Sequence, residues 1–187
     1  DLEHWGLWVD AASEHEVLGA LETAHEQFAR FLEAHDSTCG PIGNLSVVER
    51  HPPSEEGAYD FERRPATEQE RHRTLELYRW ARNDLVQILE GASNAELDWV
   101  DPSRELPRWA WWHTARQMAW HCVITDSCYY LARVGIPSPE ILAGLTSPLP
   151  APATGELVDV LARSPTHVET WIERMPANRE VVRDGEV

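Results

Sequence analysis

The chain contains no lysine: all 16 of its basic residues are arginine, set against 32 acidic residues, for a formal net charge of −16. The excess is concentrated at the front, where residues 1–62 hold 14 acids against Arg30 and Arg50. Such a surface repels phosphate backbones and anionic lipid. We therefore expect neither nucleic acid nor a membrane as a partner. A basic protein partner stays open beside the simpler explanation that the acidity serves solubility.

Cysteine is scarce, and long apolar runs are missing. The three cysteines, Cys39, Cys122 and Cys128, form no CxxC pair, so neither a disulfide framework nor a structural zinc motif is indicated. No stretch reaches the roughly 18 apolar residues of a membrane helix, and no signal peptide is visible. A reducing cytoplasm is the predicted compartment. The chain also lacks a phosphate-binding loop, a serine-hydrolase elbow and a nucleotide fingerprint.

The front of the chain predicts a small unit that mixes strands with one helix. Residues 5–9 and 45–49 are apolar enough for short strands. Between them, a helix is predicted over residues 13–34, with Ser13 and Glu16 as its capping box. Nine tryptophans along the chain supply enough buried surface for a real core.

The rest of the chain predicts three amphipathic helices. They follow a Pro-, Glu- and Gly-rich connecting segment, 51–64, and cover roughly residues 67–91, 107–134 and 154–175. Pro165 lies inside the last helix and predicts a kink there, or a restart capped by the preceding serine. Since three helices leave one apolar stripe uncovered, a four-helix arrangement is the commoner closed solution.

The central helix, 107–134, carries most of the chemistry-bearing side chains. Those near one face are Trp109, Trp112, His113, Gln117, Trp120, His121, Ile124, Cys128 and Leu131. The tryptophans are expected in the core, with an apolar ligand pocket as the alternative. Cys122 and Cys128 are expected as small core residues, because no His–Asp arrangement points at either thiol.

Three stretches resemble the DinB/YfiT-like family: Leu97-Asp98-Trp99, then the run from Ala115 to His121, then Asp126 with the aromatic residues that follow it. In that family the corresponding helix carries a metal-binding histidine and, five residues later, an acid. The resemblance covers about residues 65–187 and implies an up-down four-helix bundle. It also implies His121 as a metal ligand, Asp126 as a catalytic residue, and a divalent metal, Zn or Ni, as the cofactor.

The family's other two ligands typically form an HxxxH pair on a fourth helix, and this sequence has no histidine after Met175. The ending from Arg183 to Val187 resembles the stretch just before that helix in related sequences. Either the fourth helix is missing from this chain, or this member never had a full site, and in both cases we expect the site in this chain to be incomplete. The first residue, Asp1, is not methionine, which likewise fits a trimmed piece of a longer protein.

The front segment resembles a HicB-type fold. The residues that carry this resemblance are Asp1-Leu2, Trp5-Gly6, Ser13, Glu16, Leu18 and Phe31-Leu32. HicB-like domains usually open with a strand before this point, which this chain lacks. The predicted fold is therefore α+β and mostly α, with a HicB-like α/β segment over 1–62 and a DinB/YfiT-like helical bundle over 63–187. Many HicB proteins are antitoxins, but a domain alone does not carry that role.

His121 also has a plain structural interpretation. As a ligand it needs a neutral imidazole held by a partner, and Gln117 and Thr125 lie one helical turn away. The alternative is a buried histidine satisfied by hydrogen bonds, since one histidine does not hold a divalent ion. The histidines expected at the surface are His72, His113 and His167. For His113, a role as second ligand in a rearranged site is the alternative.

Asp126 could act as a general base beside a metal ion, or it could form an ion pair with Arg116 or Arg133. We favour the ion pair.

Two functions follow from the whole pattern. The first is a DinB-type metal-dependent enzyme, a hydrolase or thiol S-transferase acting on a small-molecule substrate. The second is a non-catalytic binding or scaffold protein that engages a protein partner, with a homodimer through the exposed apolar stripe as one arrangement.

Overall fold

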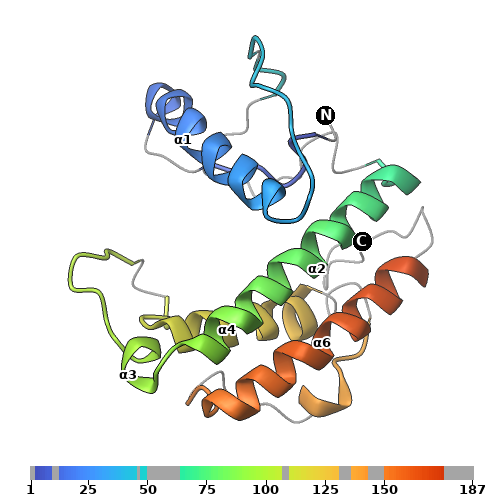
Figure 1. Cartoon of the computed structure of the whole chain (residues 1–187). Coiled ribbons are helices and arrows are strands. Elements are labelled where there is room, and N and C mark those ends of the chain that lie inside the picture. Colours follow the sequence, from blue (N-terminus) through green and yellow to red (C-terminus); the bar gives the residue numbers. More distant parts are fainter. Residues whose placement is uncertain are drawn as a thin grey trace, which may run out of the picture. The chain divides into compact units, whose positions relative to one another are not determined.

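The computed structural model describes residues 3–9, 13–45, 47–49, 64–106, 110–130, 136–142 and 150–174. Its helices are α1 (Glu14–Glu33), α2 (Glu68–Gly91), α3 (Asn94–Leu97), α4 (Ala115–Ile124), the π-helical turn η2 (Thr125–Tyr130), the 3-10 turn η3 (Glu140–Leu142) and α6 (Thr154–Arg174) (Figure 1). The mostly helical fold predicted from the sequence is confirmed. Among the helices in these ranges, none has the length and apolar character needed to cross a bilayer.

The two strands predicted in the front segment do not form in the described residues. The segment 5–9 opens in a turn, closed by the N–H of Leu7 donating to the carbonyl of His4 (3.0 Å), and Gly6 takes a φ of 93° in it. That positive φ is available to glycine and breaks an extended run. The segment 45–49 is irregular wherever it is described. Because a strand is stable only when its backbone groups are paired, neither apolar run becomes a strand alone.

The chain divides into two compact units, Asp1–Leu77 and Tyr78–Val187. The first unit contains α1 and the first turns of α2, and the second contains the rest of α2 and the later helices. The boundary that the sequence predicts between residues 62 and 63 lies outside the described residues.

α1 begins and ends close to where the sequence predicts. Ser13 Oγ accepts a hydrogen bond from the N–H of Glu16 (3.3 Å), so the predicted cap is present on that side. Acidic residues in the first turn and Arg30 in the last turn suit the helix dipole. Leu32 is fully buried, and elsewhere in the unit the indole N–H of Trp5 donates to Thr74 Oγ1 at 2.8 Å.

α2 begins with the capping box that the sequence predicts. The N–H of Thr67 donates to Glu70 Oε2 (2.8 Å), and the N–H of Glu70 donates to Thr67 Oγ1 (3.2 Å). Arg64 donates to the same carboxylate at 2.8 Å. The Arg64 hydrogen bond and the bond from Thr67 lower the pKa of Glu70 to about 2.

We expect Glu70→Gln to flatten the acid dependence of stability. A carboxylate with a depressed folded-state pKa stabilises the folded chain above its unfolded pKa, and this contribution is lost as pH falls from about 4.5 toward about 2. Urea unfolding followed by circular dichroism over this pH range measures the effect. Glu68→Gln, an exposed first-turn acid of the same helix, is the matched control and should keep the wild-type slope. Equal slopes for wild type and Glu70→Gln would contradict the assignment.

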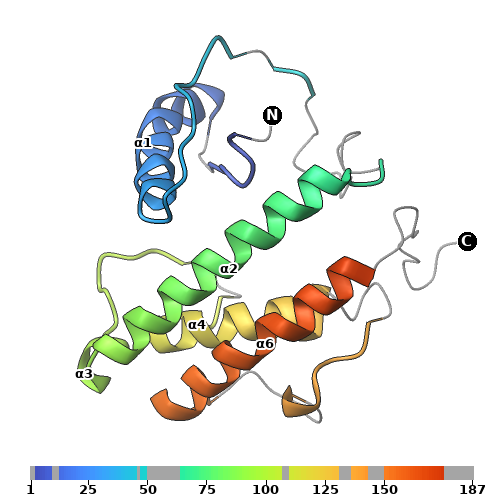
Figure 2. The ribbon, with the colours of Figure 1, turned by 45° about the vertical axis from the view of Figure 1, so that its right-hand side comes forward.

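The core of the second unit forms where α2, α4 and α6 meet (Figures 1 and 2). Its buried residues are Leu89, Leu97, Ala119, Trp120, Val123, Leu142, Leu157, Val160 and Leu161. Trp120, which is 4% exposed, is therefore a core residue as predicted. At the surface, Arg79 of α2 pairs with Glu169 of α6 at 2.9 Å.

The helix predicted over 107–134 is shorter at its start. Residues 110–113 are not helical, and α4 begins after Thr114, whose Oγ1 accepts from the N–H of Gln117 (3.2 Å). Gln117 Oε1 in turn accepts from the N–H of Thr114 at 3.2 Å. This capping box satisfies the first free N–H groups, so the helix starts there and not at Pro107. Residues 107–109 and 131–134 lie outside the described residues.

α6 runs through Pro165 as one helix, so the predicted restart at that proline is wrong. Proline removes one backbone N–H, the one that would bond the carbonyl of Leu161 four residues earlier. Leu161 is fully buried and Val168 is 5% exposed, so the turns on both sides are held by packing. We infer that this burial keeps the helix continuous despite the missing hydrogen bond.

Candidate functional site

His121, the predicted metal ligand, lies on α4 between two tryptophan rings. The Trp112 ring stacks on the imidazole with centroids 3.7 Å apart, and the Trp111 ring meets it edge-on at 5.5 Å. Thr125 Oγ1 lies 3.2 Å from Nδ1, so Thr125 is confirmed as a hydrogen-bond partner. Burial lowers the pKa of His121, against an opposing pull from Asp126. The ring is therefore mostly neutral at neutral pH.

No group of three possible ligand residues within the described ranges includes His121. A single imidazole does not hold a divalent ion. Within the described residues, His121 therefore has no full set of further ligands beside it, and its role as a metal ligand stays a prediction. The stack on Trp112 and the Thr125 hydroxyl account for the half-buried ring without a metal.

Asp126, the predicted catalytic residue, lies in η2 and forms an ion pair with Arg82 of α2. Arg82 is 7% exposed and also donates to the backbone carbonyl of Cys122 at 3.2 Å. Its guanidinium carbon lies 5.2 Å from the centre of the Tyr78 ring, within cation–π range. Burial raises the pKa of Tyr78 to about 12. Asp126 thus balances a buried cation that joins α2 to α4 and η2.

Arg116, one of the two partners predicted for Asp126, binds elsewhere. Its guanidinium donates to both carboxylate oxygens of Asp98 (2.7 and 3.0 Å), to Asn94 Oδ1 (2.8 Å) and to Thr154 Oγ1 (2.7 Å). The hydrogen bond from Arg116 lowers the pKa of Asp98. The Arg116 side chain thereby connects α4 to α3 and to the start of α6. The other predicted partner, Arg133, lies outside the described residues.

The remaining cysteines and histidines of the second unit behave mainly as structural residues. Cys122 and Cys128 are half-buried, and burial raises the pKa of the Cys122 thiol, which keeps it protonated. His113 is exposed, as expected, although it precedes α4 and does not lie on it. His167 was expected at the surface but is half-buried, with Nε2 2.8 Å from a backbone carbonyl.

Two histidines and a cysteine come together in the first unit and form a second group of possible metal ligands. His72, on α2, is exposed as expected and does not belong to this group. His4 begins the turn that contains Gly6, His25 lies on α1, and Cys39 follows the end of that helix. One ligand atom from each, an imidazole nitrogen or the thiol sulfur, lies within 4.8 Å of the other two. All three residues are half-buried. We call these three residues the His–His–Cys cluster.

Gly40 holds the His–His–Cys cluster together. Its carbonyl lies 3.1 Å from His4 Nε2 and 2.9 Å from His25 Nε2, so it accepts from whichever ring carries a proton there. Its N–H donates to Glu3 Oε2 at 3.0 Å. A Cβ atom on residue 40 would lie 2.8 Å from that oxygen, so glycine permits the close approach.

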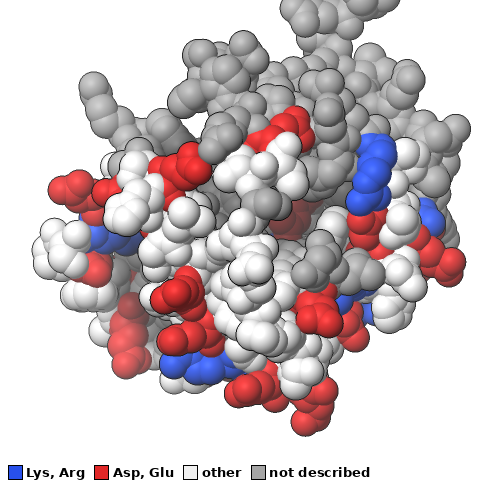
Figure 3. Space-filling model, turned by 90° about the horizontal axis from the view of Figure 1, so that it is seen from above, with Lys and Arg blue, Asp and Glu red and all other residues white. Residues whose placement is uncertain are grey.

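The spacing of the cluster fits a tetrahedral metal ion. With Zn–S near 2.3 Å and Zn–N near 2.0 Å, a sulfur and a nitrogen ligand at a tetrahedral angle lie about 3.5 Å apart. His25 Nε2 and Cys39 Sγ are 3.5 Å apart. The imidazole centroids of His4 and His25 are 5.3 Å apart. A bound ion would replace the Gly40 carbonyl as the partner of whichever Nε2 atom coordinates it. Residues 1–62 carry 14 acids against two arginines, and such a charge balance attracts cations. The face drawn in Figure 3 likewise shows more acidic than basic surface.

Sequence reasoning missed the His–His–Cys cluster. Its members are separated by 20 and 13 intervening residues, far from the short spacings of zinc motifs. The only usable signal was the concentration of five of the nine histidines in the front segment, together with Cys39. Only the return of the chain after α1 brings the three side chains to one place.

Comparison of the chain with protein-family models, with curated proteins and with solved structures found no match.

Proposed function

We propose that this protein is a metal-dependent enzyme whose divalent ion is held by His4, His25 and Cys39. The observation that carries the proposal is the convergence of these ligand atoms within 4.8 Å of one another. Two imidazoles and a thiolate suit Zn²⁺ best among the abundant divalent ions, and Ni²⁺ is the second choice. The acidic front segment adds long-range attraction for any cation.

Three ligands come together among the described residues, and that number supports catalysis over a structural role. Structural zinc sites are closed by four protein ligands, whereas catalytic sites keep three and leave a position open. A bound ion there would supply Lewis acidity to a substrate atom at the open position. Glu3 holds the Gly40 loop beside the cluster through its 3.0 Å hydrogen bond and so helps to orient the ligands. An ion with one open position would lower the pKa of a bound water for hydrolysis or of a bound thiol for S-transfer, so these are the two reaction types that we propose.

Zinc titration of the full chain against a chromophoric chelator tests the site. We expect one ion per chain, and Cys39→Ser to weaken zinc affinity by at least about 100-fold, because loss of outer-shell partners alone costs up to that much. Cobalt substitution should produce a thiolate charge-transfer band that Cys39→Ser abolishes.

His121→Gln is the matched control for this titration. It removes the histidine that the DinB/YfiT-like resemblance implies, and it should leave zinc stoichiometry and the cobalt spectrum unchanged. If zinc binding were instead lost in His121→Gln and kept in Cys39→Ser, the ion would sit in the helical unit and the proposed site would be wrong.

Activity is assayed separately on the zinc-loaded chain, with an activated ester for hydrolysis and an electrophile plus a small thiol for S-transfer. We expect turnover in one of the two assays, lost in Cys39→Ser and kept in His121→Gln. Stoichiometric zinc binding without turnover in either assay would overturn the enzymatic part of the proposal and leave a metal-binding protein.

A further inference from the structure

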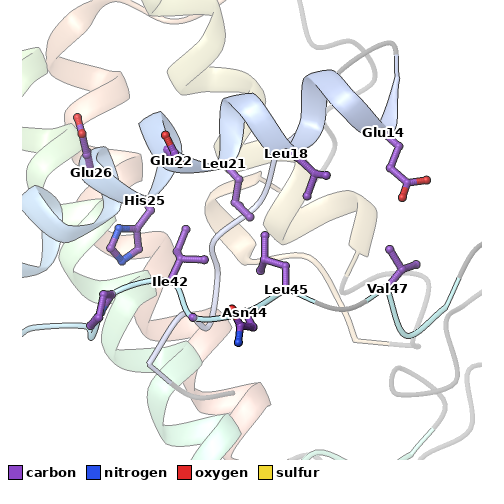
Figure 4. A pocket seen from close by; sticks show the side chains of 12 residues that line it. Glu14, Leu18, Leu21, Glu22, His25, Glu26, Ile42, Asn44, Leu45 and Val47 are labelled. Atoms are coloured by element: carbon purple, nitrogen blue, oxygen red, sulfur yellow. The ribbon is translucent and has the colours of Figure 1, made fainter.

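A groove of about 910 Å³ runs along α1 in the first unit, with residues 41–45 and Val47 as its opposite wall. Leu18 and Leu21 point from α1 toward Ile42 and Leu45 across the groove (Figure 4). Its walls are therefore mainly aliphatic, although it is open to solvent.

The aliphatic walls are exposed to an unusual degree. Leu18 is 46% exposed, Leu45 56% and Val47 52%. Scattered exposed apolar side chains are normal on protein surfaces, but a contiguous set that faces into one groove marks an interaction site. Covering these side chains would remove apolar surface from water, which supplies a driving force for binding.

Of the described residues that line the groove, those with a formal charge are all acidic. They are Glu14, Glu22 and Glu26, which lie along α1. Residues 1–62 as a whole carry 14 acids against two arginines. The complementary occupant is therefore apolar where it meets the leucines and basic where it meets the glutamates.

The open shape favours a peptide over a small molecule. A small ligand normally loses 70–90% of its surface to an enclosing pocket, which half-exposed walls cannot provide. From Glu14 to Glu26 the groove extends about 18 Å along the helix, the length of five or six extended residues. In the described part of the chain, the backbone of residues 42–45 makes no hydrogen bond, so its N–H and C=O groups are free to pair with an added extended segment.

We propose that this groove binds a basic, apolar segment of a partner protein in extended conformation, with its apolar side chains between α1 and residues 41–45 and its basic side chains at the glutamates. His25, one of the proposed metal ligands, also lines the groove. The binding role rests on the aliphatic and acidic side chains of the groove, requires neither a metal ion nor turnover, and is measured on the chain without added metal.

Fluorescence anisotropy with a labelled octapeptide of alternating leucine and arginine tests the proposal on the full chain. Two matched peptides carry serine in place of leucine, or glutamate in place of arginine. We expect the Leu/Arg peptide to bind at least about tenfold more tightly than the Ser/Arg peptide, and the Leu/Glu peptide not to bind. Equal affinity for the Leu/Arg and Ser/Arg peptides would show attraction by net charge alone and overturn the proposal.

Variants of the chain locate the binding. Leu21→Ser should weaken binding of the Leu/Arg peptide about tenfold. The control Ile88→Ser, at a 63% exposed position on α2, should leave it unchanged. Val47 lies on the non-helical wall of the groove, so Val47→Ser tests the groove without changing α1. It gives an independent measurement of peptide affinity if Leu21→Ser disturbs that helix. Glu22→Gln should weaken binding, whereas Glu33→Gln, on the same helix but outside the groove, should not. No difference between the groove variants and their controls would overturn the proposal.

Two other occupants are tested in the same experiment. Sedimentation of the chain alone reports a second copy, and a dimer that Leu21→Ser dissociates would assign the groove to self-association. Decylammonium, titrated as a competitor below its micelle concentration, reports a small apolar cation. If it displaced the Leu/Arg peptide at equal or lower concentration than unlabelled peptide, the groove would be a small-molecule site. Either result would overturn the peptide proposal.

Discussion

Replacing Arg82 with leucine is expected to lower the free energy of unfolding by about 3 kcal/mol. Arg82 is 7% exposed, and its guanidinium balances the carboxylate of Asp126, whose side chain is 26% exposed. Removing the cation leaves a largely desolvated negative charge without a partner and also breaks the 3.2 Å bond to the carbonyl of Cys122. Losing one partner of a buried pair costs far more than the pair contributes, because the remaining charge cannot return to water.

Urea unfolding at neutral pH measures this loss. Arg163→Leu is the matched control, because Arg163 also pairs with an aspartate, Asp159, but the two side chains are 64% and 71% exposed. That exposed pair should change stability by less than about 0.5 kcal/mol. The double variant Arg82→Leu with Asp126→Leu should recover much of the loss, since no charge is then left unpaired. Similar losses for Arg82→Leu and Arg163→Leu would mean that the buried pair does not stabilise the fold.

The second large effect is expected from Leu161→Ala, which should lower the free energy of unfolding by about 3 kcal/mol through lost burial and the cavity that remains. Leu161 is fully buried in the core where α2, α4 and α6 meet. It also precedes Pro165 by one turn, where α6 lacks a backbone hydrogen bond. Packing at Leu161 therefore supports both the core and the weakest turn of that helix.

Denaturant unfolding with an unchanged m-value would confirm that Leu161→Ala acts on stability and not on compactness. Ile88→Ala, at a position that is 63% exposed, is the control and should stay within about 0.5 kcal/mol of wild type. A loss at Leu161 no greater than the loss at Ile88 would show that the α6 interface does not stabilise the unit.

The surroundings of His121 suit a structural role, whereas the surroundings of His25 suit metal binding. Burial lowers the pKa of His121, and its ring is stacked on Trp112 and bonded to a threonine hydroxyl, which satisfies an isolated imidazole. His25 has a second imidazole and a thiol within ligand distance. The DinB/YfiT-like resemblance implies His121 as a metal ligand. A metal ion, however, needs several ligand atoms close together. The geometry therefore favours the cluster in the first unit.

Local sequence patterns determined the helices and their caps. Ser13, Thr67 and the apolar spacing after each predicted α1 and the start of α2, because a cap depends on residues only three positions apart. The same reasoning placed the start of the central helix too early, because a proline and a threonine cap compete and both look adequate locally. It also predicted strands at 5–9 and 45–49, because an apolar run does not reveal whether a partner strand will pair with it.

Composition and spacing by themselves determined that this chain is acidic and mostly helical. They did not determine which tryptophans form the core, because among the described residues Trp120 is buried whereas Trp8 and Trp99 are exposed. Only the tertiary structure decided which charges are paired and which ligands converge. Asp126 meets Arg82 from 44 residues away, and His4 meets Cys39 from 35 residues away. Helical periodicity acts over one or two turns, whereas these contacts depend on how whole segments fold back on one another. The packing of many side chains at once decides how these segments fold back, so no short sequence motif predicts such contacts.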